Sequence, residues 1–116
     1  MSCFIDIDGH DVWNPANRVA KLFIAQTKAT ADAFAMGSGV GDVIEDQCSI
    51  DGATFTAFVT TLLAEYEHTN NITLRRLMEG VLTVSLTLLK RAGLPPELPA
   101  HWHQHVEAQD HHMPKA

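Results

Sequence analysis

The sequence predicts a mainly helical fold, in which three helices form the core, a short N-terminal β-hairpin precedes them and a carboxy-terminal segment docks on them. Three long stretches, residues 15–36, 51–68 and 72–92, carry apolar side chains at helical spacing. An alternating segment before them ends at Asp8-Gly9, a pair typical of hairpin turns. Because the three stretches account for most of the 116 residues, helix dominates the predicted fold.

The predicted hairpin opens the chain. Cys3, Ile5 and Ile7 share one side of an extended segment, and Val12 and Trp13 follow the turn. A two-stranded hairpin is barely stable alone in water, so we expect it to pack on the helices.

The first helix is predicted to begin after Asn14, a good N-cap residue that is followed by proline at the first helical position. Val19, Leu22 and Phe23 belong to its apolar face, which we expect to lie in the core. The helix is predicted to end at Gly37, where glycine favours termination.

Residues 37–50 form the longest segment predicted to be irregular. Its glycine run, residues 37–41, is interpreted as the end of the first helix and a flexible connection. A phosphate-binding loop is the alternative, but such loops follow a strand and open a helix, whereas this run follows a helix. The acidic stretch at residues 42–46 comes next and would repel a phosphate.

The second and third helices are predicted from their ends as well as their apolar stripes. Asp51 is expected to cap the second helix, which ends near His68. The third stretch is ambiguous at residues 82–88, where apolar and hydroxyl residues alternate as in a strand. A helix is favoured because the upstream part steps helically and Lys90-Arg91 suits a helix C-terminus. Being apolar nearly all round, it is expected to be the central helix.

Composition excludes two classes of partner. Eight basic residues stand against 14 acidic ones, and the formal charge of −6 disfavours both nucleic acid and membrane surfaces. No apolar run reaches the ~20 residues of a membrane span, and the amino terminus lacks a secretory pattern, so we expect a cytoplasmic protein. Size and composition predict one helical domain over residues 1–100, followed by a histidine-rich segment at 101–116 with a frayed end.

The histidine-rich segment is the most unusual feature of the sequence. His101, His103 and His105 would share one face of a strand, whereas in a helix His101 would pair with His105, and His103, Glu107 and His111 would form a second stripe. Either arrangement can hold a divalent transition metal, since imidazole is a common ligand for these ions. A solvated tail that binds metal adventitiously is the preferred interpretation, because no ligand-spacing motif is present.

Glu45, Asp46 and His68 are the candidate general acids and bases. A carboxylate beside a partly buried histidine can be tuned toward neutral pH, but spacing alone does not show that these residues meet. A carboxylate cluster in a loop is more often a solvated turn, and we prefer that interpretation.

Four short motifs resemble a small uncharacterised bacterial domain family of similar length. They are Val12-Trp13-Asn14-Pro15, Val19-Ala20-Lys21-Leu22-Phe23, Ser38-Gly39-Val40-Gly41, and Ile50-Asp51 with Phe55 to Leu63. The resemblance covers roughly residues 3–95 and leaves the histidine-rich end outside it. It implies a single compact domain with no established activity.

The leading functional hypothesis is a small accessory or interaction protein, because no assembled catalytic motif is present. Surplus apolar side chains favour a homodimer with the hairpin or the third helix at the interface. The alternative is a small helical enzyme or ligand-binding protein that encloses an apolar small molecule between the helices. In that case Glu45, Asp46 or His68 would transfer protons, or the tail histidines would hold a metal. Convergence of these groups on a concave apolar site would distinguish the two hypotheses.

Overall fold

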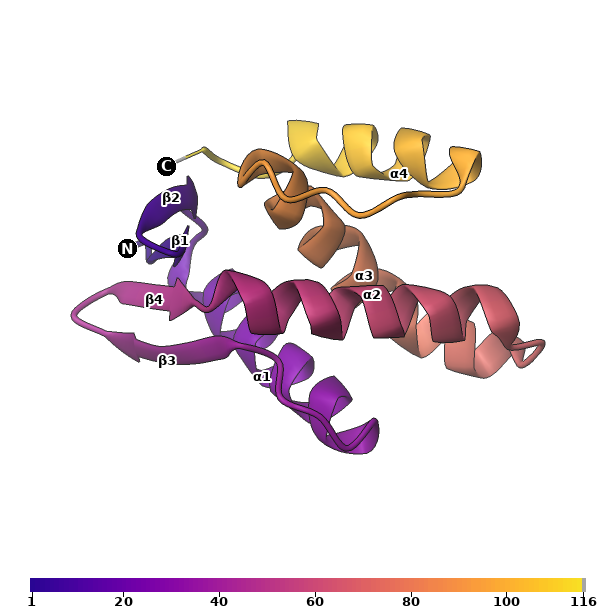
Figure 1. The fold of residues 1–116 in the computed structure, drawn as a ribbon. Helices are drawn as coiled ribbons and strands as arrows, with labels where there is room; N and C mark the ends of the chain where they lie inside the picture. The colour runs from indigo at the N-terminus through magenta and orange to yellow at the C-terminus, as the bar shows by residue number, and fades with distance from the viewer. Residues whose placement is uncertain (116) are drawn as a thin grey trace.

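The computed structural model describes residues 1–115 and shows an α+β fold, with four helices and a four-stranded mixed sheet in that part of the chain (Figure 1). The elements follow in the order β1 (Phe4–Ile7), β2 (His10–Trp13), α1 (Asn17–Ala33), β3 (Val40–Ile44), β4 (Gln47–Ile50), α2 (Gly52–His68), α3 (Ile72–Arg91) and α4 (Ala100–His111). The predicted mainly helical class, a three-helix core with a single hairpin, is therefore wrong. The prediction lacked a second hairpin and a fourth helix. In the structure the two hairpins join into one sheet.

The sheet has the strand order β2-β1-β4-β3 and lies at one end of the molecule (Figure 1). β1 pairs with β2 and β3 pairs with β4 in antiparallel hairpins, while β1 and β4 pair in parallel at the centre. Each hairpin has a two-residue turn with both residues at positive φ, Asp8 with Gly9 and Glu45 with Asp46. The segment predicted to be irregular at residues 37–50 thus contains two strands.

The second hairpin escaped prediction for a physical reason. Its turn is Glu45-Asp46, which lacks the glycine or asparagine that normally marks positive φ. Its strands are only five and four residues long, and β4 depends on the parallel partner β1, more than 40 positions earlier in the chain. Pairing over that separation leaves no local pattern in the sequence.

The helix ends follow local chemistry where a capping side chain is present. Asp51 accepts a hydrogen bond from the backbone N–H of Thr54 at the start of α2, as predicted. α1 instead begins at Asn17 without a side-chain cap, so the predicted start at Pro15 is two residues early. It ends at Ala33 rather than Gly37.

Gly39 fixes the approach of β3 to the start of α2. Its φ is +81°, and a Cβ atom there would lie 2.8 Å from both the carbonyl oxygen of Asp51 and the backbone nitrogen of Phe55. A side chain at this position would collide with backbone atoms, which cannot move aside cheaply.

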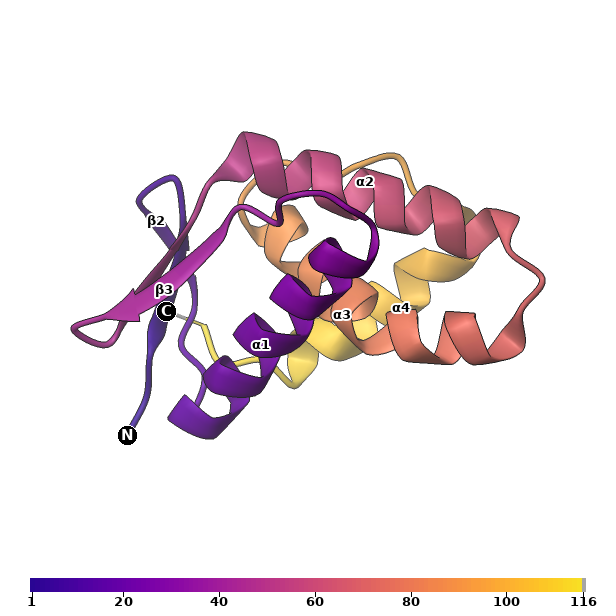
Figure 2. The same cartoon turned by 90° about the horizontal axis from the view of Figure 1, so that it is seen from below.

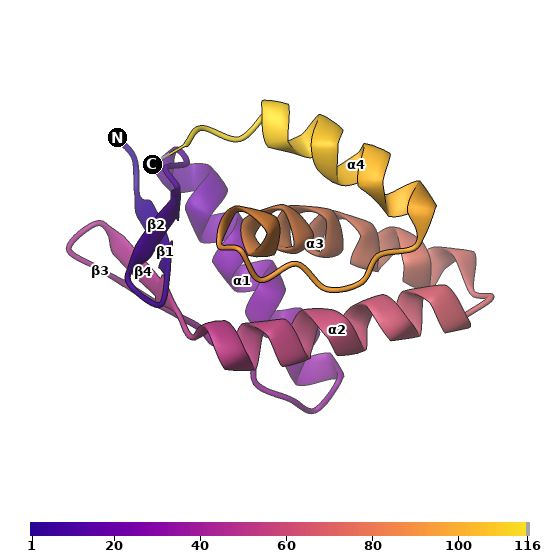
Figure 3. The same cartoon turned by 45° about the horizontal axis from the view of Figure 1, so that its top comes forward.

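α3 is the central helix. α2 and α4 pack along it on different sides, as Figure 3 shows, and α1 crosses it on a further face that is seen from below in Figure 2. Leu82, Leu86 and Leu89 of α3 are fully or almost fully buried in the common core. No helix among residues 1–115 combines the length and apolar character needed to cross a bilayer.

The carboxy-terminal segment is a packed helix rather than a short docked segment. Trp102 and Val106 of α4 and the following Met113 are each at most 4% exposed and belong to the same core as the sheet. The backbone N–H of Asn14 donates to the carbonyl of Pro114 over 3.1 Å, so the described chain is tied down almost to its end.

Candidate functional site

An apolar groove runs between α1, α3 and the end of the chain, and we call it the α1–α3 groove. Its volume is about 480 Å³. Figure 2 shows the two helices crossing on this side of the molecule. Its lining residues include Trp13, Val19, Leu22, Phe23, Gly80, Val81, Val84 and Met113.

Two side chains of the groove are exposed although the sequence placed them in the core. Val19 is 48% and Leu22 is 58% exposed, whereas their neighbour Phe23 is buried. α1 buries the adjacent face instead, which includes Ala20, Ile24 and Thr27. The expectation that Val19 and Leu22 lie in the core is therefore wrong, and the groove presents apolar surface to solvent.

Trp13 forms one end of the groove. Its ring meets the ring of Phe23 edge to face, with centroids 5.5 Å apart and an interplanar angle of 82°. The indole is 3% exposed, so the tryptophan is a rigid wall rather than a mobile surface group.

Gly80 leaves the wall of the groove open in the middle of α3. A Cβ atom built at Gly80 would meet no heavy atom within 4 Å, and its φ is in the ordinary range for any residue. Glycine inside a helix costs about 1 kcal/mol relative to alanine. No contact among residues 1–115 requires a glycine at position 80, whereas a close backbone contact requires one at position 39. An isolated glycine in a helical pattern is itself a sign of special packing or function, and sequence reasoning missed it here.

Arg91 holds the chain end that closes the groove. Its guanidinium donates to the carboxylate of Asp110 over 2.6 Å and to the backbone carbonyls of Val12 and Met113 over 3.0 and 2.7 Å. The Arg91 side chain is only 10% exposed, so these charge-assisted bonds form largely away from water. They fix the position of Met113, which lines the groove.

Asp6 shows that a buried carboxylate of this protein serves the fold. It accepts hydrogen bonds from the Ser49 hydroxyl and the Gln47 amide, each over 2.7 Å, and from the backbone N–H of Gly9 over 2.9 Å. Burial alone would raise the pKa of Asp6, but these three bonds outweigh it and hold the pKa below its usual value. The charged carboxylate thereby ties β1 to β4 and to the first turn.

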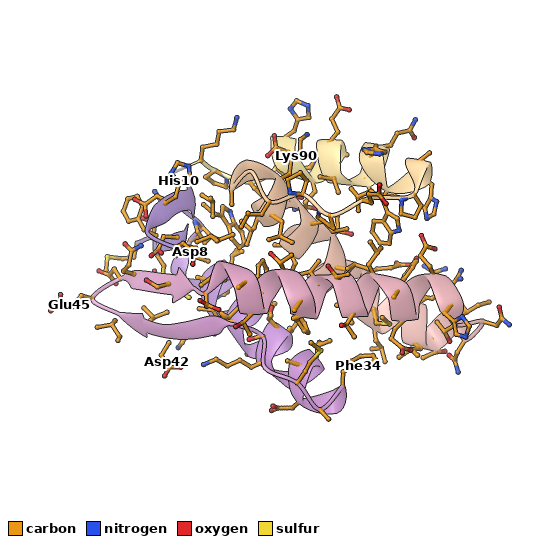
Figure 4. The ribbon with its side chains drawn as sticks, in the orientation of Figure 1. Asp8, His10, Phe34, Asp42, Glu45 and Lys90 are labelled. Atoms are coloured by element: carbon orange, nitrogen blue, oxygen red, sulfur yellow. The ribbon has the colours of Figure 1, made fainter. Side chains whose placement is uncertain are left out.

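The predicted acid–base residues do not meet. Glu45 and Asp46 form the exposed tip of the β3–β4 hairpin, and Figure 4 shows Glu45 pointing into solvent there. His68 is exposed at the last residue of α2. α2 alone spans about 25 Å, and the hairpin extends from its other end, so the structure does not bring these groups together (Figure 1).

α4 divides the three predicted metal-binding histidines between two faces. His101 and His105 line a small pocket beside Tyr66 and Trp102, whereas His103 lies near the proline-rich loop before α4. This is the helical arrangement that the i, i+4 spacing implies. Within residues 1–115 no group of three histidine, cysteine or acidic side chains is placed to hold a metal ion.

The two cysteines are free and buried. Cys48 is completely buried, and burial together with the nearby Cys3 raises the pKa of its thiol to about 11. A thiol with that pKa stays protonated at neutral pH and is a poor nucleophile. Both side chains contribute to the core beneath the sheet.

Comparison with known proteins gives one match. The model of a family described as a family of unknown function, DUF6086, matches residues 1–115. No curated protein matches the chain, and no solved structure matches it either.

Proposed function

Because the chain belongs to DUF6086, a family of unknown function, we propose a function from the geometry: the protein binds an apolar small molecule in the α1–α3 groove. The observation that carries the proposal is the open space at Gly80. The chain bears the helical cost of a glycine at this position, and the glycine lines the groove.

The size and surface of the groove support a small ligand. Binding sites for small molecules have volumes of roughly 300–1,000 Å³ and mostly apolar walls with a few polar groups. The α1–α3 groove falls in that range, and its polar side chains are Gln26, Gln109 and His112. A bound ligand would remove the exposed surface of Val19 and Leu22 from water, and this burial of apolar surface would favour binding.

The lining favours binding over catalysis. His112 is the one titratable side chain among the groove residues, all of which belong to the described chain, and no carboxylate or cysteine is among those lining residues. General acid–base chemistry needs a positioned donor and acceptor near the reacting atoms. We therefore assign the groove a carrier or sensor role rather than a reaction.

Fluorescence of the neutral apolar probe N-phenyl-1-naphthylamine tests the proposal. The probe should bind the protein saturably, with one site per chain. Gly80→Phe should abolish binding, because a Cβ atom at this position meets no other atom and the added ring is expected to occupy the groove that Gly80 lines. Circular dichroism and thermal unfolding check that the variant is folded.

Two matched variants complete the experiment. Gly80→Ala adds only a methyl group and should keep most of the binding. Ala64→Phe places the same ring on the exposed surface of α2, outside the groove, and should bind like the natural protein. Equal binding by Gly80→Phe and Ala64→Phe would show that the probe does not occupy the groove and would overturn the proposal.

A further inference from the structure

A second, smaller pocket lies between α2, α3 and α4, on a different side of α3 from the groove, and we call it the α2–α4 pocket. Its volume is about 130 Å³. Its lining residues are Tyr66, Glu79, Thr83, His101, Trp102 and His105. One carboxylate and four aromatic or imidazole side chains therefore gather at this pocket.

Aromatic rings form the walls of this pocket. The rings of Tyr66 and Trp102 meet edge to face, with centroids 5.0 Å apart and an interplanar angle of 68°. The ring of His105 stands 5.7 Å from that of Trp102 at 60°. The faces of aromatic rings carry π-electron density that attracts cations, so an aromatic lining suits a positive ligand.

Hydrogen bonds hold the walls in place and leave negative charge at the pocket. The Tyr66 hydroxyl donates to the Glu79 carboxylate over 3.0 Å. The indole N–H of Trp102 and the Nε2 atom of His101 both approach one oxygen of Glu67, at 3.0 and 3.1 Å. These bonds fix the ring orientations before any ligand arrives, which reduces the entropic cost of binding.

The protein already uses one of these rings to hold a cation. The guanidinium of Arg75 lies over the Tyr66 ring, 5.1 Å from its centroid, and its Nε donates to the Tyr66 backbone carbonyl. Arg75 is not among the residues that line the pocket, so it does not fill the space between Tyr66 and Trp102. The carboxylates of Glu67 and Glu79 outnumber the guanidinium of Arg75, so with the imidazoles of His101 and His105 neutral the surroundings favour a positive ligand over a negative one.

We propose that the α2–α4 pocket binds a small organic cation, a methylated or primary ammonium group, against the rings of Tyr66 and Trp102 and the carboxylate of Glu79. Ammonium groups suit such a site because they are attracted by both ring faces and carboxylates. The site is independent of the α1–α3 groove and accepts a ligand of opposite character.

Titration of ¹⁵N-labelled protein with tetramethylammonium chloride tests this proposal, with sodium chloride keeping the ionic strength constant. Trp102 lines the pocket and Trp13 lines the groove, so the indole N–H resonance of each tryptophan reports on its own site. The Trp102 resonance should shift saturably while the Trp13 resonance stays in place. The neutral molecule tert-butanol, which has a similar shape, should not shift Trp102.

Two charge-matched variants sharpen the test. Glu79→Gln keeps an oxygen that accepts the Tyr66 hydroxyl but removes the charge, and should weaken binding about fivefold, the effect of one opposite charge at about 4 Å in water. Glu65→Gln makes the same charge change at an exposed site on α2 and should leave binding unchanged. Equal effects of the two variants, an equal shift with tert-butanol, or no saturable shift of Trp102 would each overturn the proposal.

Discussion

The sheet end and the α1–α3 side of the molecule differ in how completely their residues are packed and hydrogen-bonded. At the sheet end, Asp6 accepts three hydrogen bonds and Gly39 lies in tight backbone contact with α2. On the α1–α3 side, Val19 and Leu22 are about half exposed and Gly80 faces empty space. The polar and glycine residues of the first region serve the fold, whereas the incomplete packing of the second has no structural use within the described chain.

The two regions differ in whether their unusual residues have a structural role. A buried carboxylate is often a catalytic candidate, but the carboxylate of Asp6 accepts hydrogen bonds that join β1 to β4. The residues without a structural role lie on the α1–α3 side. They are Gly80, which has no side chain, and the exposed apolar residues Val19 and Leu22. A glycine-to-alanine substitution should therefore lower the free energy of unfolding at the sheet end and raise it on the α1–α3 side.

The largest expected effect is at the sheet end. Gly39→Ala should lower the free energy of unfolding by about 3 kcal/mol, because the new Cβ atom is strained at positive φ and overlaps backbone atoms of Asp51 and Phe55. Urea unfolding followed by circular dichroism measures the change. A loss below about 1 kcal/mol would mean that the contact between β3 and α2 is loose.

A smaller effect is expected at Asp6 and should depend on pH. Asp6→Asn should cost about 2 kcal/mol at pH 7, since it removes a charged acceptor from three donors. The pKa of Asp6 is lowered in the folded state, so this stabilisation is complete above the unfolded pKa near 3.9 and is lost as pH falls through the folded value.

Urea unfolding at a series of pH values checks the prediction for Asp6. The difference between natural protein and Asp6→Asn should be constant from pH 5 to 7 and should shrink below about pH 4. Glu65→Gln, at an exposed site, provides the control for net charge. A difference that stays constant down to pH 2 would contradict the hydrogen-bonded charge as its cause.

The smallest effect has the opposite sign. Gly80→Ala should raise the free energy of unfolding by about 1 kcal/mol, because alanine restricts the unfolded chain and its methyl group meets nothing in the folded one. Thermal unfolding measures it alongside Gly39→Ala. Destabilisation by Gly80→Ala would reveal a structural need for glycine and would remove the comparison on which the groove proposal rests.

How much of the fold was predictable depended on whether its determinants are local. The cap at Asp51 and the end of α2 at His68 were predicted correctly, because neighbouring residues determine them. The parallel pairing of β1 with β4 was not, because it joins segments far apart in the chain and β4 has only four residues. α4 was missed because only Trp102 and Val106 are buried in it, too few to give a helical stripe.

The groove was less predictable than the helices that form it. Val19 and Leu22 fit the apolar stripe of α1, and periodicity alone does not show that the tertiary packing turns the neighbouring face inward. Arg91 appeared only as a favourable residue at a helix end, although its main partners, Val12 and Asp110, lie 79 and 19 positions away. Gly80 was the one local indication of the site.

The measurement that tests the groove most directly follows the Trp13 indole resonance in two titrations of ¹⁵N-labelled protein. One varies N-phenyl-1-naphthylamine at fixed protein concentration, and the other dilutes the protein alone. We predict that Trp13 shifts saturably with the probe, stays fixed on dilution and leaves Trp102 unaffected. If the Trp13 resonance does not shift with the probe but shifts on dilution, a second copy of the chain covers the groove. That result would contradict the proposed function.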